Sequence, residues 1–147
     1  MEWNFDNQRP IYTQLAEMIR MCIITGIYQP GSRLPSVREL ANEASVNPNT
    51  MQKALSELER TGLIYAVRTS GRFVTEDEEK IASARRELAE GEVEDFLRKM
   101  RDLGIQKDEV IELIRRAETD KRSETAGASG KTGDTGADSR TGDVYDE

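Results

Sequence analysis

Two closely spaced helix-start signals constrain this chain more than any other feature of its sequence. Residues 36–39 spell a capping box, in which the Ser36 hydroxyl and the Glu39 carboxylate satisfy backbone amides at the start of a helix. Asn47 and Pro48 form the second signal, with asparagine suited to the cap and proline to the first helical position. A helix that runs from the first signal to about Ala44 leaves only about three residues before the next helix, as in a helix-turn-helix.

A helix is expected before this pair and a hairpin after it. Thr61 and Gly62 end the second helix of the pair, and 63–67 then form a β-rich run. Residues 68–71 have turn chemistry, so 72–75 can return as a second strand. The first helix follows Pro10, ends near Gly26 and repeats apolar side chains at spacings of three and four, namely Ile11, Leu15, Met18, Ile19, Cys22 and Ile23. This order is typical of a winged helix-turn-helix.

The expected fold is therefore α+β and mostly helical, with three parts. Residues 1–75 form the winged helix-turn-helix DNA-binding domain, and residues 76–118 form a helical dimerisation segment with a break at Leu103 and Gly104. The apolar stripe of that segment needs a cover, which we expect to be a second copy of the chain. The alternative is that the segment packs back on the winged helix of the same chain. Residues 119–147 are rich in Gly, Ser, Thr and Asp and are expected to form a disordered acidic tail.

The composition argues against an enzyme. The chain has no histidine and a single cysteine, Cys22, which removes the common zinc patterns and the histidine-dependent nucleophiles. Acidic residues 76–79 could hold a metal, but consecutive side chains diverge around a helix, so a solvated helix start is the better interpretation. We expect no metal site and no cofactor. Neither a long apolar run nor a signal-like amino terminus occurs, so a cytoplasmic protein without a membrane partner is expected.

The net charge of −7 is unevenly distributed along the chain. Residues 1–75 contain 8 Lys and Arg against 7 Asp and Glu, whereas residues 76–118 contain 9 against 14. The stretch 60–75 contains three arginines and no acid. A local positive field on the first domain is therefore compatible with an acidic molecule and a nucleic-acid partner.

The residues expected to contact DNA form three groups. In a helix-turn-helix, the second helix enters the major groove with its amino-terminal side chains toward the bases, and here those are Asn47, Asn49, Thr50, Gln52 and Lys53. Ser36 and Arg38 begin the preceding helix, where amides and a guanidinium can converge on one phosphate. The hairpin tip offers Arg68, Thr69, Gly71 and Arg72 to a minor groove or phosphate. Arg33 either joins them or pairs with a nearby carboxylate.

A winged-helix module that binds protein rather than DNA is the main alternative. It would be favoured by an apolar or acidic recognition face, whereas this face carries Asn, Gln and Lys side chains.

Four stretches carry a resemblance to a known family. They are Pro10-Ile11-Tyr12-x-Gln14, Gly31-x-x-Leu34-Pro35-Ser36-x-Arg38-x-Leu40-Ala41, Val46-Asn47-Pro48-Asn49-Thr50-x-Gln52-Lys53-Ala54-x-x-x-Leu58, and Gly62-Leu63-Ile64. The chain resembles the GntR family of bacterial transcription regulators, and its segment around Leu103-Gly104-Ile105, with Glu109 and Ile111, resembles the YtrA subfamily. The resemblance covers residues 1 to about 117.

The resemblance implies a dimeric repressor that binds a pseudo-palindromic double-stranded DNA operator, often near genes for transporters of the ATP-binding cassette type. It places the DNA contacts on the positions named above, including the wing around 69–72. Many members carry two glycines at the wing, whereas 69–71 has one. Larger relatives append an effector domain, but the 43 residues between Thr75 and Thr119 are too few to enclose a usual ligand pocket in one subunit. The sequence does not identify a small-molecule effector.

Overall fold

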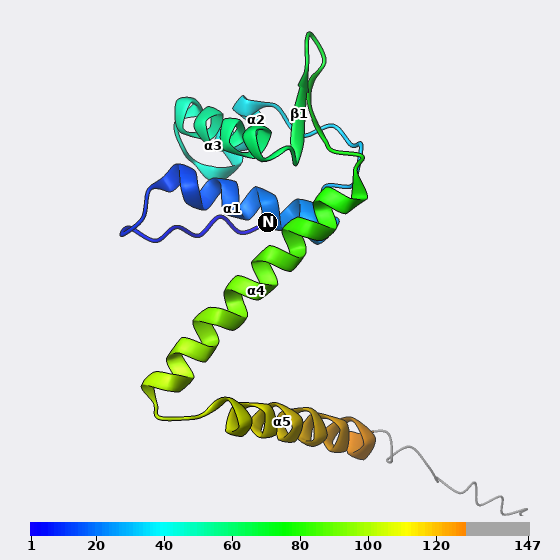
Figure 1. The fold of residues 1–147 in the computed structure, drawn as a ribbon. Helices are drawn as coiled ribbons and strands as arrows, with labels where there is room; N and C mark the ends of the chain where they lie inside the picture. The colour runs from blue at the N-terminus through cyan, green and yellow to red at the C-terminus, as the bar shows by residue number, and fades with distance from the viewer. Residues whose placement is uncertain (129–147) are drawn as a thin grey trace, which may run out of the picture. The chain divides into compact units, whose positions relative to one another are not determined.

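The computed structural model describes residues 1–128, with side chains described as far as residue 122. The elements follow the predicted order (Figure 1): α1 (Ile11–Ile24), α2 (Val37–Ala44), α3 (Pro48–Thr61), β1 (Ile64–Val67), β2 (Gly71–Val74), α4 (Glu78–Asp102) and α5 (Lys107–Ala128). The chain divides into two compact units, Met1–Glu94 and the residues from Asp95 onward. The first unit is a winged helix-turn-helix, which confirms the predicted fold class.

Local capping signals place the ends of α2 and α3 where the sequence predicts them. The Ser36 side chain accepts a hydrogen bond from the Glu39 amide, and the Glu39 carboxylate accepts one from the Ser36 amide, both at 3.2 Å. Ser45 ends α2 in the left-handed conformation with φ 55°, and the Val46 amide donates to the Ala41 carbonyl at 3.0 Å. Only residues 45–47 separate α2 from α3. The tight turn fixes the direction in which α3 leaves α2.

The buried side chains of α1, α2, α3 and the hairpin form one core. Leu15 and Ile19 of α1, Leu40 of α2 and Leu55 of α3 are at most 1% exposed. Burying a Leu or Ile side chain stabilises a fold by about 1.5–3 kcal/mol. The face of α3 opposite Leu55 is therefore presented to solvent on a rigid support.

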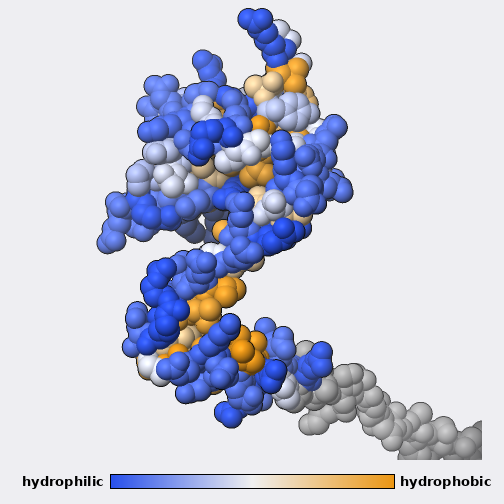
Figure 2. Space-filling model, in the orientation of Figure 1, coloured by the Kyte–Doolittle hydropathy of each residue, from blue (hydrophilic) through white to orange (hydrophobic). Residues whose placement is uncertain are grey.

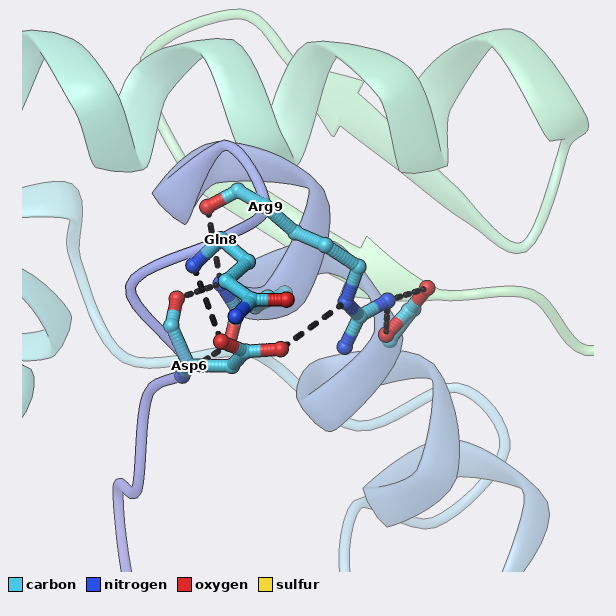
Figure 3. Close-up of polar contacts among 5 residues, drawn as sticks. Asp6, Gln8 and Arg9 are labelled. Carbon is cyan, nitrogen blue, oxygen red and sulfur yellow. Dashed lines mark hydrogen bonds and ion pairs between the residues drawn. The ribbon is translucent and has the colours of Figure 1, made fainter.

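Gln14 is a buried polar side chain that holds the amino-terminal arm against α1. Its amide nitrogen donates to the carbonyls of Asp6 at 2.7 Å and Arg9 at 3.0 Å, and its oxygen accepts from the Asp6 amide at 2.7 Å. Figure 3 shows the surrounding contacts, in which Asp6 also accepts from the Gln8 amide and Arg9 pairs with Glu17. The backbone of Asp6 and Arg9 thus supplies hydrogen bonds to the buried polar atoms of Gln14, which offsets the free energy lost when those atoms leave water.

The sheet has one face toward the helices and one toward solvent. The antiparallel register pairs Ile64 with Val74 and Tyr65 with Phe73. Ile64 and Val74 are buried, whereas the rings of Tyr65 and Phe73 stack on the outer face with centroids 5.8 Å apart. The apolar side chain of Phe73 predicts a core residue from the sequence, but the structure places it half-buried on the outer face, so that prediction is wrong. Side chains alternate along a strand, so burying Val74 turns Phe73 outward.

The extended segment 31–34 pairs with β2, on the side of β2 that faces away from β1. The Val74 amide donates to the Ser32 carbonyl, and the Leu34 amide donates to the Arg72 carbonyl, both at 2.9 Å. Arg33 lies opposite Phe73 in this pairing. The sequence favours a turn at 29–32 and shows no alternating pattern over so short a segment, so this pairing is not predicted. The pairing ties the loop before α2 to the wing.

The first turns of α4 complete the core of the winged domain. Ile81 and Ala84 are each 6% exposed and belong to the same apolar cluster as Leu15. Arg85 Nη2 donates to the Ile24 carbonyl at 2.8 Å. The first compact unit therefore extends past Thr75, where the sequence analysis ends the domain. The first turns of α4 therefore pack on the winged helix of the same chain, which is the alternative given above for the predicted dimerisation segment.

The second unit contains the end of α4, a turn and α5. Gly104 has φ 77°, and the Ile105 amide donates to the Met100 carbonyl at 2.9 Å, which closes α4 with the predicted glycine cap. Val110 is 2% exposed, but most apolar side chains of the two helices remain open to solvent. Those with 40–69% exposure are Val93, Phe96, Leu103, Ile111, Leu113 and Ile114. Figure 2 shows orange, hydrophobic surface on the helices that follow the hairpin.

Helix α5 continues to Ala128, beyond the point at 119 where the sequence analysis begins its tail. The first part of the predicted disordered tail is therefore helical, and the prediction is wrong there. A composition that cannot build a core can still extend a helix that is already nucleated, because each added residue adds a hydrogen bond. The rest of the predicted tail, from residue 129, lies outside the described residues.

Cys22 behaves as a small apolar residue of the α1 stripe. It is 3% exposed, and burial raises the pKa of its thiol, which disfavours the reactive thiolate. Its Sγ lies 3.0 Å from Met1 Sδ. This environment agrees with a packing role.

Candidate nucleic-acid interface

The amino-terminal half of α3 presents a polar face on the surface of the winged domain. Asn49 and Gln52 are exposed and Thr50 is half-buried, while Met51 and Ala54 between them are buried in the core. Asn47 is exposed but serves as the cap, since its Oδ1 accepts from the Asn49 amide at 2.8 Å. Asn and Gln side chains can pair bidentately with adenine. Asn49 and Gln52 are therefore the side chains on this face best placed to read bases.

Lys53 is positioned by a contact that the sequence analysis missed. Its Nζ lies 3.9 Å from the centroid of the Tyr12 ring, so α3 and α1 are joined by a cation–π contact. Such a contact is worth about 0.5–1 kcal/mol at an exposed site. The charge of Lys53 remains on the surface, but its side chain is held in one direction.

The start of α2 and the wing border a common groove. Its volume is about 320 Å³, and its lining includes Arg33, Ser36, Arg38, Gly71 and Arg72. Within residues 1–128, Arg38 is exposed and has no ion pair. The groove therefore brings Ser36 and Arg38 together with one part of the predicted hairpin group, Gly71 and Arg72, whereas Arg68 and Thr69 do not line it.

The wing separates the two arginines that the sequence placed together. Arg68 and Thr69 are exposed at the tip, and Thr69 adopts φ 75° where a glycine would be unstrained. Arg72 instead pairs with Glu59 of α3, and its side chain is only 19% exposed. The alternation of β2 puts Arg72 on the same face as Val74, toward the helices. The prediction placed Arg72 at the hairpin tip beside Arg68, whereas the structure holds its side chain against Glu59 of α3.

Comparison with known proteins identifies the family. Residues 11–74 match the family described as "Bacterial regulatory proteins, gntR family". The HTH-type transcriptional regulator YhcF of Bacillus subtilis (strain 168) is 37% identical over 115 residues, which cover 78% of this chain and 95% of YhcF. This chain belongs to the GntR family.

Two further comparisons agree with the GntR assignment. The HTH-type transcriptional repressor YtrA of Bacillus subtilis (strain 168) is 46% identical over 68 residues, which cover 46% of this chain and 52% of YtrA. The structure of a GntR family transcriptional regulator from Listeria monocytogenes has a TM-score of 0.72 and 42% identity, covering 76% of this chain and 98% of that one. The family and the polar face of α3 together make this chain a DNA-binding transcriptional regulator.

The acidic run at the start of α4 has a capping role in this GntR chain. Asp77 Oδ1 accepts from the amides of Glu79 at 3.1 Å and Lys80 at 3.4 Å. Among the residues that the structure describes, no group of three or more acidic or cysteine side chains is placed to hold a metal. The described helices also include none that is long and apolar enough to cross a membrane.

Three residues that support the GntR interface were not assigned a role from the sequence. Tyr12 contacts Lys53, Gln14 holds the amino-terminal arm, and Glu59 holds Arg72. Tyr12 and Gln14 lie in the motif at 10–14 that carries the family resemblance, and the structure gives each of them a contact. No sequence signal identifies Glu59, because its pairing depends on the register of the hairpin.

Proposed function

We propose that this chain is a transcriptional repressor of the YtrA type that binds a pseudo-palindromic operator as a homodimer. The observation that carries the DNA-reading part is the solvent-exposed polar face at the start of α3, directly after the tight turn at 45–47. The repressor role is supported by the 46% identity to YtrA over the winged domain. Such a regulator acts in the cytoplasm, where bacterial DNA lies.

The homodimer is supported by the apolar side chains that α4 and α5 leave in solvent. Phe96 is 42% exposed, Leu103 is 69% exposed and Ile114 is 49% exposed. Large exposed apolar patches on soluble proteins mark interaction sites. A two-fold dimer buries the same patch on both copies, so one set of helices supplies both sides of the interface.

In this proposal, the interface residues divide into base readers, phosphate contacts and positioning groups. Asn49 and Gln52 read bases, with Thr50 and Lys53 beside them. Arg38 and the Ser36 hydroxyl contact a phosphate, because the Ser36 amide is engaged by Glu39. Arg68 and Thr69 reach DNA from the tip of the wing. Asn47, Gly71 and Arg72 shape the site through the α3 cap, the wing backbone and the Glu59 pair.

Protein binding through the wing is the second candidate function, and one surface favours it. The outer face of the wing leaves Tyr65 and Val67 each 41% exposed. This patch lies on the sheet rather than on α3. A protein-binding function without DNA recognition predicts that substitutions on α3 leave the interaction unchanged.

Substitutions of Arg38 and Gln52 separate phosphate contacts from base readout. Arg38→Ala should weaken binding to all duplexes about equally and reduce the slope of log affinity against log salt by about 1, because one phosphate contact is lost. Gln52→Ala should relax preference at one base pair by about 1–3 kcal/mol. Fluorescence anisotropy over a salt series, with Arg60→Ala as a charge-matched control, measures both effects. Altered sequence preference in Arg38→Ala with an unchanged slope would show that Arg38 reads a base.

Substitutions of Ser36 separate capping from DNA binding. Ser36→Ala should lower the free energy of unfolding by about 1 kcal/mol, since the capping oxygen is lost. Ser36→Asp should keep the cap but repel a phosphate, so its stability should stay near wild type while its DNA affinity falls. Thermal unfolding and a binding titration compare the two variants. If Ser36→Asp binds DNA with wild-type affinity, no phosphate is bound at the start of α2.

A further inference from the structure

Arg33 lies across the wing rather than in the loop where the sequence places it. The pairing of 31–34 with β2 puts Arg33 opposite Phe73, and its guanidinium extends along the sheet to Gly71. A Cβ at Gly71 would stand 3.3 Å from Arg33 Nε and 3.5 Å from Nη2. A side chain at position 71 would therefore press on the guanidinium, which would have to shift by a few tenths of an ångström.

The charge of Arg33 is not used within the protein. Among the ion pairs of residues 1–128, none includes Arg33, which is exposed. Arg72 has the opposite environment, since it is paired with Glu59 on the face toward α3. Arg72, on the inner face of the sheet, is thus neutralised by an ion pair. Arg33, on the outer face, is available to bind an anion.

The neighbours of Arg33 make the groove suitable for a phosphate. Arg38 lines the same groove of about 320 Å³ and is also unpaired in the described part of the chain. The nearby Glu39 carboxylate is engaged by the Ser36 amide at 3.2 Å. Each guanidinium has a planar fork of donors that matches the oxygens of a phosphate.

We infer that Arg33 binds a backbone phosphate of DNA at the junction of the wing and α2. This inference rests on the proposed DNA-binding function and transfers to Arg33 the phosphate contact that the sequence pattern assigns to Arg72. Arg33 lies on the sheet face turned away from α3, so it addresses the DNA backbone rather than the bases that α3 reads. Gly71 is the positioning residue, because its missing side chain lets the guanidinium lie against the wing.

A salt titration on full-length protein with a short random-sequence DNA duplex tests the role of Arg33. Arg33→Gln should reduce the slope of log affinity against log salt by about 1, the change expected for one lost phosphate contact. Arg60→Gln removes the same charge from the far end of α3, where Arg60 pairs with Glu57, and should leave the slope unchanged. Arg72→Gln should lower the melting temperature, because Glu59 loses its ion-pair partner. A wild-type slope in Arg33→Gln, or a reduced slope in Arg72→Gln alone, would overturn the inference.

A double-mutant cycle tests whether Gly71 acts through Arg33. Gly71→Ala should reduce the slope in the wild-type background, because the new Cβ displaces the guanidinium, and should reduce it no further in the Arg33→Gln background. Thermal unfolding checks that the wing remains folded, since φ 105° at position 71 also strains alanine. An equal effect of Gly71→Ala in both backgrounds would contradict positioning through Arg33. Failure of the wild-type protein to bind any duplex would instead overturn the proposed DNA-binding function.

Discussion

A chain that ends at Glu94 is expected to be a folded monomer, whereas the full-length protein is expected to be a dimer. The truncation keeps the whole first compact unit and removes Phe96, Leu103 and the α5 helix, which carry five of the six exposed large apolar side chains of α4 and α5. The monomer reads only one half-site, so its affinity for the operator should fall by about 10³-fold or more, toward non-specific binding. Analytical ultracentrifugation and an operator titration measure the two effects.

The position of the cut matters because α4 belongs partly to the winged domain. A chain that ends at Thr75 loses Ile81 and Ala84, which are buried in the core, and the Arg85 hydrogen bond to Ile24. Loss of the Ile81 side chain alone should cost about 2 kcal/mol. The shorter chain should therefore unfold at a lower temperature than the chain that ends at Glu94.

A substitution in the full-length protein provides the matched test of the dimer. Phe96→Glu should shift the protein toward monomer because it places a charge in the apolar interface. Arg98→Glu makes a larger charge change at a nearby side chain that is 64% exposed, and should leave the dimer intact. A dimer that persists in Phe96→Glu and in the chain that ends at Glu94 would place the interface on the winged domain.

Inserting five base pairs between the operator half-sites is expected to abolish tight binding. A dimer with two-fold symmetry presents its two α3 helices to half-sites about one helical turn apart, roughly 10 base pairs, or a multiple of that spacing. Five added base pairs rotate one half-site by about half a turn, so only one α3 helix can reach its groove. The affinity should fall by about 10³-fold or more, toward the non-specific level.

A ten-base-pair insertion is the control for this spacing experiment, because it restores the rotational phase and lengthens the site by about one turn. It should recover part of the lost affinity if the DNA or the α4–α5 helices can adapt. Equal tight binding to the original and five-base-pair sites would contradict a rigid two-fold reader. Footprinting of each duplex shows whether one or both half-sites are protected.

The helix-turn-helix could be predicted from the sequence because its determinants are local. The Ser36 capping box, the Asn47 cap and Gly62 each act within one turn of helix, and the structure shows all three at the expected positions. The polar face of α3 follows from the same boundaries, since helical periodicity then decides which side chains point outward.

The parts that were wrong depend on contacts between distant segments. The outward direction of Phe73 and the pairing of Arg72 follow from the strand register and from Glu59, which residues 71–74 alone do not specify. Arg33 could not be assigned because its surroundings include the pairing of 31–34 with β2. The first unit extends past Thr75 because Ile81 packs in its core. The sequence alone does not distinguish Ile81 from the other residues of the long apolar stripe.

Selection of binding sites from random duplex DNA by the full-length protein tests the central claim most directly. A two-fold dimer that reads bases through α3 should enrich an inverted repeat, and Gln52→Ala should lose preference at one symmetric position in each half of that repeat. Enrichment of a single asymmetric site, or of no sequence at all, would contradict the account of this chain as a dimeric operator-binding repressor.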